Sequence, residues 1–391
     1  EAPLRPSGLP RIGGQVAQIY LDPETDEERS SNSADLITLI KFGEALHGEQ
    51  GVGHALAITD VPPMVEPLES AMLMAEWASN PGAAFAWHAD QIDYLVEMGD
   101  ILGRKDWFGW GAICFAHPLR FDRDTADKFA ARVHAGQPIG ITAMPVAGAS
   151  TPVTIEGFVV VACAEVIATW ITGRVMNPEI GLYASMWPGT LDMGSGAVSY
   201  SSPDSMRYGC AACEFMRRWT GFTMTMGGSE YCDAKAPGLY AGIEKALKAM
   251  TISAFTGQGL GCGGGMVDEG RTLSPIQLLI DREFAQAMNN LVGDFDPSPE
   301  RIAMDEILDV GLGLERSHIE TDHTLEYLRD SLWLPALMGR SGWTPAHERE
   351  VIDAMRTRVR ELLDSYVKPE GREDELVAMR KVVDRARREL L

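Results

Sequence analysis

Short apolar runs alternate with longer amphipathic stretches along most of the chain. Apolar runs bounded by turn residues predict strands. The predicted strands are 54–60, 83–87, 111–115, 138–144, 179–186, 221–227, 259–264 and 316–321. Apolar positions at helical spacing predict helices over 64–79, 90–103, 122–135, 153–172, 203–219 and 239–256. A strand followed by a helix, repeated eight times, is typical of an α/β protein built as a (β/α)8 TIM barrel.

The two ends of the chain do not follow this alternation. Residues 1–50 predict an N-terminal arm followed by a helix, and residues 345–391 predict a C-terminal helical extension. Extra helices over 275–291 and 300–310 would be inserted before the last strand. We therefore expect the barrel to occupy residues 51–344. A doubly wound open sheet is the alternative, because the last two predicted strands are mostly glycine and mostly polar.

A turn-rich elbow lies within residues 144–168, between an apolar run and a long apolar segment. Gly148 gives the backbone freedom of φ, and Pro152 fixes φ near the value of a first helical turn. Ser150 or Thr151 is expected to cap the amides that follow. The elbow therefore predicts a strand, a loop of small residues and a buried helix.

Charge limits the classes of partner that the chain can bind. Its 391 residues carry a formal net charge of −22. Nucleic acids and anionic membranes both favour Lys and Arg, so neither is an expected partner. The charge is compatible with a cationic substrate.

The six cysteines, at positions 114, 163, 210, 213, 232 and 262, show no dense pairing pattern. Cys210 and Cys213 have CxxC spacing, but no second CxxC or closely spaced His pair would complete a zinc site. We expect reduced thiols, no bound metal and a cytoplasmic protein. Neither a signal peptide nor a membrane helix is expected, because the apolar spans are interrupted.

The candidate catalytic and binding residues lie just past the predicted strand ends, where the reactive side chains of a barrel are found. Trp187, Glu269 and His323 occupy such positions, and Trp110 lies on a predicted strand–helix loop. Aromatic faces bind quaternary ammonium groups by cation–π contact, so Trp110 and Trp187 are candidate substrate ligands or ordinary packing residues. His323 is either a site residue or only the start of the following helix.

A dense glycine run covers residues 257–265 and contains GLGCGG, which matches the dinucleotide pattern GxGxxG. It falls late in the chain and does not open a strand–helix–strand unit with a following acid, so it is not interpreted as a nucleotide site. Glycines permit close backbone approach. Either a large planar ligand or another strand would account for Gly263, Gly264 and Gly265.

Four segments resemble the trimethylamine/glycine betaine:corrinoid methyltransferase family, in order and spacing, over roughly residues 105 to 345. They are the elbow MPVAGASTPV, SEYCDAKAPGLYAGIEKAL, GCGGGMVDEG with SPIQLLIDREF, and DEILDVGLG with IETDHTLEYLRDSLWLP. The resemblance implies a TIM barrel. It also implies that Asp233 and Lys235 bind substrate in the loop after the sixth strand, and that Glu269 and His323 are catalytic residues near the pocket.

Two positions depart from the family pattern DxQAG. This chain has Gly238 where the family has Asp, and Tyr240 where it has Gln. Tyr240 is therefore a further substrate-binding candidate, and the departure bears on which amine is bound.

The resemblance implies transfer of a methyl group from a quaternary or tertiary amine, such as glycine betaine, to a Co(I) corrinoid. The family's archaeal trimethylamine enzymes carry pyrrolysine in the region of GGGMVDEG, where this chain has ordinary residues. A quaternary ammonium departs as a neutral amine, so ordinary side chains suffice. No DxHxxG cobalamin motif occurs, which implies that a partner corrinoid protein supplies the cofactor against Gly263–Gly265, with none tightly bound here.

We also expect a homo-oligomer. Two alternatives remain open at this point. One is a divergent barrel enzyme that acts on a cationic small molecule, and the other is a non-catalytic protein that binds such a molecule.

Overall fold

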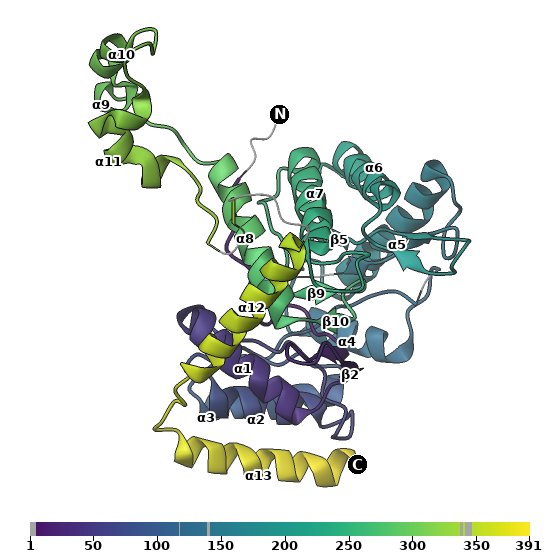
Figure 1. Cartoon of the computed structure of the whole chain (residues 1–391). Helices are drawn as coiled ribbons and strands as arrows, with labels where there is room; N and C mark the ends of the chain where they lie inside the picture. Colours follow the sequence, from purple (N-terminus) through teal and green to yellow (C-terminus); the bar gives the residue numbers. More distant parts are fainter. Residues whose placement is uncertain (1–4, 117, 139–140, 337–338, 341–345) are drawn as a thin grey trace.

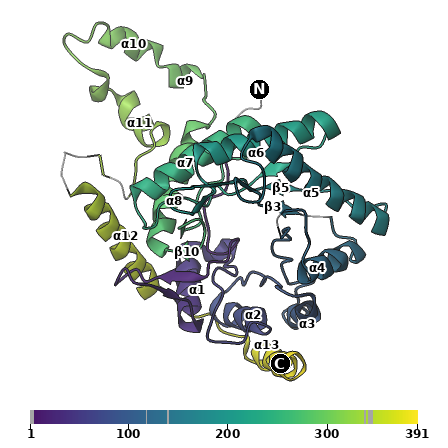
Figure 2. The same cartoon turned by 90° about the vertical axis from the view of Figure 1, so that its right-hand side faces the viewer.

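The computed structural model describes residues 5–116, 118–138, 141–336, 339–340 and 346–391. It is a mixed α/β structure in which α1 to α8 form a ring around short strands (Figure 2). The ring helices are α1 Ser33–His47, α2 Glu66–Trp77, α3 Ile92–Ile101, α4 Arg123–His134, α5 Ile155–Met176, α6 Pro203–Thr220, α7 Leu239–Thr256 and α8 Pro275–Leu291. The helix predicted over 275–291 is thus present, but α8 packs against α7 as a member of the ring and is not an insertion.

Parallel backbone contacts connect neighbouring segments inside the ring. β3 (Thr142–Ala143), β5 (Ser185–Met186) and β8 (Thr225–Met226) form one parallel sheet in the order β3-β5-β8. Further parallel bridges join Ala17 to Leu56, Val52 to Pro81, Phe85 to Gly109 and Arg5 to Gly259. The first seven predicted strands all contribute backbone hydrogen bonds to such pairs, although residues 139–140 of the fourth lie outside the described residues.

The N-terminal segment joins the two ends of this series. β1 (Ile19–Leu21) pairs in parallel with β10 (Thr272–Leu273), and it also pairs with β2 (Glu28–Ser30). β10 continues antiparallel to β9 (Met266–Val267). Between β8 and the glycine segment the link is a side chain, because Gln258 Oε1 accepts from the Met226 amide at 2.7 Å and its Nε2 donates back to the Met226 carbonyl at 3.0 Å.

The strand predicted over residues 316–321 was wrong. His318–Glu320 form a single 3-10 turn, followed by α11 (Asp322–Ser331). RSHIET offers one apolar residue to a core, whereas β1 reads IYL and buries Tyr20 and Leu21. A strand inside the ring must be apolar on both faces, so the N-terminal segment takes the place beside the glycine segment.

The predicted elbow is present, with a different capping residue. β4 (Val146–Ala147) pairs in parallel with β6 (Gly189–Leu191), which pairs with β7 (Val198–Ser199), and Gly148 has a φ of +87°. Thr154 caps α5 by accepting the Gly157 amide at 3.3 Å. Ser150, expected as a cap, instead accepts the Val146 amide and closes the turn.

The helix α5 is long and apolar enough to cross a membrane, judged by length and composition alone. No other helix among the described residues meets that test. Phe158, Ala162 and Val166 of α5 are buried in the core that it shares with α6. We therefore assign α5 to the protein core.

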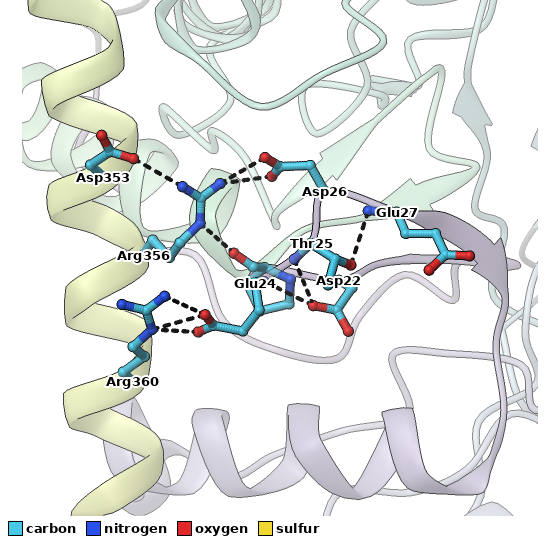
Figure 3. Close-up of polar contacts among 9 residues, drawn as sticks. Asp22, Glu24, Thr25, Asp26, Glu27, Asp353, Arg356 and Arg360 are labelled. Carbon is cyan, nitrogen blue, oxygen red and sulfur yellow. Dashed lines mark hydrogen bonds and ion pairs between the residues drawn. The ribbon is translucent and has the colours of Figure 1, made fainter.

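Two C-terminal helices cover one side of the ring (Figure 1). α12 (His347–Asp364) packs on α1 and α8, and α13 (Glu373–Leu390) packs on α2 and α3. Figure 3 shows how α12 holds the turn between β1 and β2: Arg356 donates to both oxygens of Asp26, and Arg360 pairs with Glu24.

Residues 294–334, which we call the arm, stand away from the ring (Figure 1). The arm holds α9 (Pro299–Ile302), α10 (Met304–Val310) and α11, so the helix predicted over 300–310 is present here in two pieces. Its return to the ring is fixed at Ala336, whose amide donates to Glu283 of α8 at 2.6 Å.

Candidate functional site

An aromatic cavity of about 350 Å³ lies where the parallel segments end. Four rings line it: Phe85 and Trp87 after the third segment, Trp187 after β5, and Tyr231. The Phe85 and Trp87 ring centroids lie 6.2 Å apart, and those of Trp187 and Tyr231 lie 5.1 Å apart with their planes at 72°. The other lining residues are Gly14, Gln15, Val16, Gly111, Ala112, Thr142 and Met144. Of the four rings, only Trp187 was predicted from the sequence.

A buried hydrogen-bond network orients two of these rings. The Trp87 indole Nε1 donates to Glu66 Oε2 at 2.6 Å, and His54 Nε2 lies 3.1 Å from Glu66 Oε1. The Phe85 amide donates to His54 Nδ1 at 3.3 Å, so His54 carries its proton on Nε2 and donates it to Glu66. Burial raises the pKa of Glu66, but the hydrogen bonds from His54, Trp87 and Ser70 outweigh it and hold this pKa below its usual range.

Two glycines allow the other two rings their positions. A Cβ at Gly227 would lie 2.1 Å from Trp187 Nε1, and a Cβ at Gly270 would lie 2.0 Å from Tyr231 Cε1. Both rings therefore pack directly on backbone. Trp187 Nε1 is fixed by donation to Ser185 Oγ at 2.9 Å. Tyr231 therefore touches both the cavity and the acidic turn, at Gly270.

The acidic turn between β9 and β10 has unusual backbone geometry. Asp268 and Glu269 have φ of 51° and 54°, and the Gly270 amide closes the turn on the Val267 carbonyl. Adjacent non-glycine residues in the left-handed region are uncommon and are associated with functional sites. Lys235 pairs with Asp268 at 2.5 Å, and Arg271 approaches the same carboxylate, so Lys235 holds the outer side of the turn.

The Glu269 carboxyl is buried beside that of Asp233. Burial, then the hydrogen bond and charge of Asp233, raise the pKa of Glu269 to about 9 against the opposing charge of Lys248. Neither Glu269 oxygen has a partner of full hydrogen-bond geometry among the described residues, whereas Asp233 Oδ2 accepts from Ser199 Oγ at 2.7 Å. Burial and the neighbouring Asp233 both disfavour the ionised form of Glu269, so Glu269 keeps its proton at neutral pH.

Lys248 of α7 completes this cluster and was not predicted. Its Nζ donates to the Tyr200 carbonyl and lies 3.4 Å from Ser201 Oγ. Burial lowers the pKa of Lys248 to about 8, partly offset by the charges of Glu269 and Glu230. The signal in the sequence was that Lys245 and Lys248 share a helix face with Ala241, Ala249 and Ile252, which are buried.

The structure brings Trp187, Tyr231, Asp233 and Glu269 together, but it places other predicted site residues elsewhere. Trp110 packs against Phe108 at 5.1 Å and lines a separate cavity of about 500 Å³ beside α3 and α4. Tyr240 is exposed on the outer face of α7, where Glu244 raises its pKa. Neither side chain is among the described residues that line the cavity with Trp187, and their part in substrate binding stays a prediction.

His323 lies on α11 of the arm and is not among the residues that line the aromatic cavity. Its amide donates to Glu306 Oε1 at 3.2 Å, and its ring packs on Tyr327 at 4.7 Å between centroids. The predicted position depended on a strand over 316–321, and that strand is absent. The structure thus does not join His323 to Glu269.

The glycine crowding has an internal cause. A Cβ at Gly263 would lie 2.2 Å from Asp281 Cβ, and one at Gly265 would lie 2.9 Å from the Ser274 carbonyl oxygen. The amides of Gly264 and Gly265 both donate to Asp281 Oδ2. Close approach of α8 therefore explains these glycines, while contact with a corrinoid stays a prediction. Gly263 and Gly264 also line a cavity of about 270 Å³.

All six cysteines are free, as predicted. Burial raises the pKa of Cys210 to about 11 and that of Cys213 to about 12. Within the described ranges, no group of three or more His, Cys, Asp or Glu side chains is arranged to hold a metal ion.

Comparison with known proteins identifies the family. Residues 19–390 match the family model described as trimethylamine methyltransferase (MTTB). The chain is 24% identical to trimethylamine methyltransferase MttB2 of Methanosarcina mazei over 71% of this chain and 55% of that protein. It is 22% identical to trimethylamine methyltransferase MttB of Desulfitobacterium hafniense over 93% of this chain and 74% of that protein.

A third relative has a different named substrate. The chain is 25% identical to glycine betaine methyltransferase of Desulfitobacterium hafniense, over 64% of this chain and 52% of that protein. The chain thus spans about half the length of the M. mazei and glycine betaine relatives. Since the family model covers nearly the whole sequence, the chain belongs to the trimethylamine methyltransferase (MTTB) family.

Proposed function

We propose that this protein transfers a methyl group from a quaternary amine, such as glycine betaine, to the Co(I) corrinoid of a separate partner protein. The observation that carries the proposal is the cavity of four aromatic rings, Phe85, Trp87, Trp187 and Tyr231. Aromatic cages of this kind recognise permanently charged ammonium groups. Membership of the family supports methyl transfer as the reaction.

We also propose that the fold is a complete (β/α)8 barrel. The parallel pairs from Ala17 through Gly259, with β1 closing against β10, support a complete (β/α)8 barrel whose first strand is the N-terminal segment. In such a barrel the substrate site lies at the C-terminal ends of the strands. Trp87 and Trp187 lie just past those ends in the third and sixth segments.

Each part of the site has a role in this reaction. The rings hold the trimethylammonium group and exclude water. Glu269 lies next to Tyr231 and is not among the described residues that line the cavity, so its role is to support that ring from behind. Lys248 supplies positive charge at the same end, which favours a substrate that carries a carboxylate at the other end of its short chain.

The corrinoid supplies the nucleophile when its protein docks. As the carbon–nitrogen bond breaks, the electron pair stays on nitrogen, so the product amine leaves neutral and no proton is required of the protein. The chain's own contribution is to position the substrate and keep the cavity dry, which are the effects that in-line displacement needs. We propose a cytoplasmic location and no tightly bound cofactor for this chain.

The test combines the protein with a Co(I) corrinoid and a panel of betaines and methylamines. Formation of demethylated amine together with methylated corrinoid is the expected result. Trp187→Leu should reduce the rate strongly, whereas the matched variant Trp110→Leu should not, because Trp110 lines another cavity. Absence of both products across the panel, with the protein folded, would overturn the proposal.

Binding can be measured separately from turnover. Titration calorimetry should show that glycine betaine binds more tightly than 3,3-dimethylbutanoate, its carbon isostere, in which an uncharged tert-butyl group replaces the trimethylammonium group and the carboxylate is kept. A cation–π contact is worth about 0.5–2 kcal/mol per ring, which corresponds to about 2- to 30-fold in affinity. Selective binding of betaine without methyl transfer would identify a binding protein, and equal binding of the two compounds would remove the aromatic-cage argument.

A further inference from the structure

The arm, residues 294–334, has almost no core of its own. Val310 and Thr321 are its only buried residues. Its large apolar side chains point outward, with Leu312 90% and Phe295 88% exposed. The others are Ile302, Met304, Ile307, Leu308, Leu314, Ile319, Leu325, Leu328, Leu332 and Leu334. A segment that exposes this many large apolar side chains is a candidate interaction site.

A second apolar surface lies on the half of the ring that α12 and α13 do not cover. On the outer face of α7 the exposed apolar residues follow helical spacing: Tyr240, Ile243, Leu247 and Met250. The neighbouring helices α5 and α6 add Val160, Ile171, Val175, Phe215 and Trp219. We call this surface the α5–α7 face. Figure 2 shows α13 across the ring from α5 and α6, α12 beside α8, and the arm extending outward from α8. The first turn of α12 reaches only the start of α7, where Glu348 accepts the Leu239 amide.

The two surfaces also complement each other in charge. The arm carries eleven Asp and Glu residues against three Arg residues. The rim of the α5–α7 face is closer to neutral: α6 exposes Arg207, Arg217 and Arg218 against Asp204 and Glu214, and Arg218 pairs with Glu214. In a chain with a net charge of −22, this face is a favourable place for an acidic segment to dock.

We propose that the arm of one copy docks on the α5–α7 face of a second copy, and that the exchange is reciprocal. Because both surfaces belong to one chain, a two-fold pair covers both arms and both faces at once. A stable interface buries about 800 Å² on each partner, and the arm offers its exposed apolar side chains toward that area. The proposal is independent of the proposed activity.

The first test is the association state. Sedimentation velocity between 1 and 100 μM should show a dimer or a larger assembly with even subunit number. Leu325→Glu on the arm and Leu247→Glu on α7 should each shift the protein toward monomer by 10-fold or more in dissociation constant. Val367→Glu, an equally exposed change between α12 and α13, is the matched control and should leave association unchanged. All three positions are exposed in the single chain, so none of these variants should unfold it.

The second test identifies the contact. A photo-cross-linking amino acid at Leu312 should link two copies carrying different tags, and mass spectrometry should place the adduct on α5, α6 or α7. Three outcomes would overturn the proposal. These are a monomer at every concentration, cross-links confined to one chain, and an assembly that Leu325→Glu and Leu247→Glu leave intact. An arm that cross-links only to a different added protein would likewise assign the surface to that partner.

Discussion

Lys245 and Asp281 form an ion pair with no solvent exposure on either side chain, and their Nζ and Oδ2 atoms lie 2.8 Å apart. The pair joins α7 to α8. Asp281 Oδ2 also accepts the amides of Gly264 and Gly265, and Oδ1 accepts from Gln277. One buried carboxylate therefore anchors the loop that leads into the acidic turn.

We expect Lys245→Met to destabilise the protein by about 3–5 kcal/mol, because it leaves the Asp281 charge buried without its counter-ion. Urea unfolding followed by circular dichroism measures this change. Lys235→Met is the matched control, since Lys235 pairs with Asp268 while largely exposed, and it should change stability by less than about 1 kcal/mol. Similar effects for the two variants would show that the buried pair is not the anchor.

The second prediction concerns pH and Glu269. Its pKa is raised from 4.5 to about 9, so over that range the folded protein keeps a proton that the unfolded chain releases. Stability from this group is complete below pH 4.5 and falls as pH rises toward 9, with a slope of at most about 1.4 kcal/mol per pH unit. Glu269→Gln removes the titrating group. The variant should therefore gain stability relative to the parent between pH 5 and 8.

Urea midpoints at several pH values would measure that difference. Asp268→Asn, on the exposed side of the same turn, controls for general effects of neutralising a carboxylate there. Parallel pH profiles for the parent and Glu269→Gln would mean that Glu269 is ionised at neutral pH.

The third prediction concerns the start of α7. Gly238 stands where the family has Asp, and Glu348 of α12 instead accepts the Leu239 amide at 3.2 Å. A Cβ at Gly238 would lie 2.9 Å from Glu348 Oε1, so Gly238→Asp alone should destabilise the protein by about 1–2 kcal/mol through crowding and like charge. In a Glu348→Ala background the same change should cost less, because the crowding and like charge are gone, while the strain of a side chain at a φ of +159° remains.

A double-mutant cycle of unfolding free energies measures this coupling. Additive effects would contradict the capping role of Glu348. The amine specificity should be unchanged in Gly238→Asp, since this position contacts α12 and is not among the residues that line the aromatic cavity.

The fourth prediction concerns the support of Trp87. Glu66→Gln replaces the ionised acceptor of the Trp87 and His54 hydrogen bonds, so stability should fall by about 1.5–3 kcal/mol. Betaine affinity should fall with it, because the ring is no longer held in place. Glu76→Gln, on the exposed ion pair with Lys368, is the matched control and should affect neither quantity. Tryptophan fluorescence measures both quantities for the two variants: stability during urea unfolding and affinity during titration with betaine.

The sequence predicted the ring helices well, because each carries an apolar face long enough to establish a helical period. It also singled out Trp187, Asp233 and Glu269, which follow predicted strands or lie in motifs that resemble the family; the structure places them close together, and their roles stay predictions. It failed where local pattern and tertiary position disagree. RSHIET contains alternation without enough apolar surface for a core, whereas β1 is only three residues long and lies in a segment that looks irregular.

The remaining site residues carry weak local signals. Trp87 and Tyr231 become cavity walls only because Glu66 orients the Trp87 ring and Gly270 leaves room for the Tyr231 ring. Lys248 resembles an ordinary helical lysine, and its burial depends on what faces α7 in three dimensions. These relationships join positions far apart in sequence, so no window of the chain reveals them.

The pairing of β1 with β10 has a consequence for biosynthesis. The ribosome releases Ile19 some 250 residues before Thr272, and until then the first strand has an unsatisfied edge. Exposed strand edges invite aggregation, and contacts of such long range form slowly. The sheet that contains β1 therefore cannot be completed until the segment with β10 has been synthesised. A chaperone would help the nascent chain most during this late stage of synthesis.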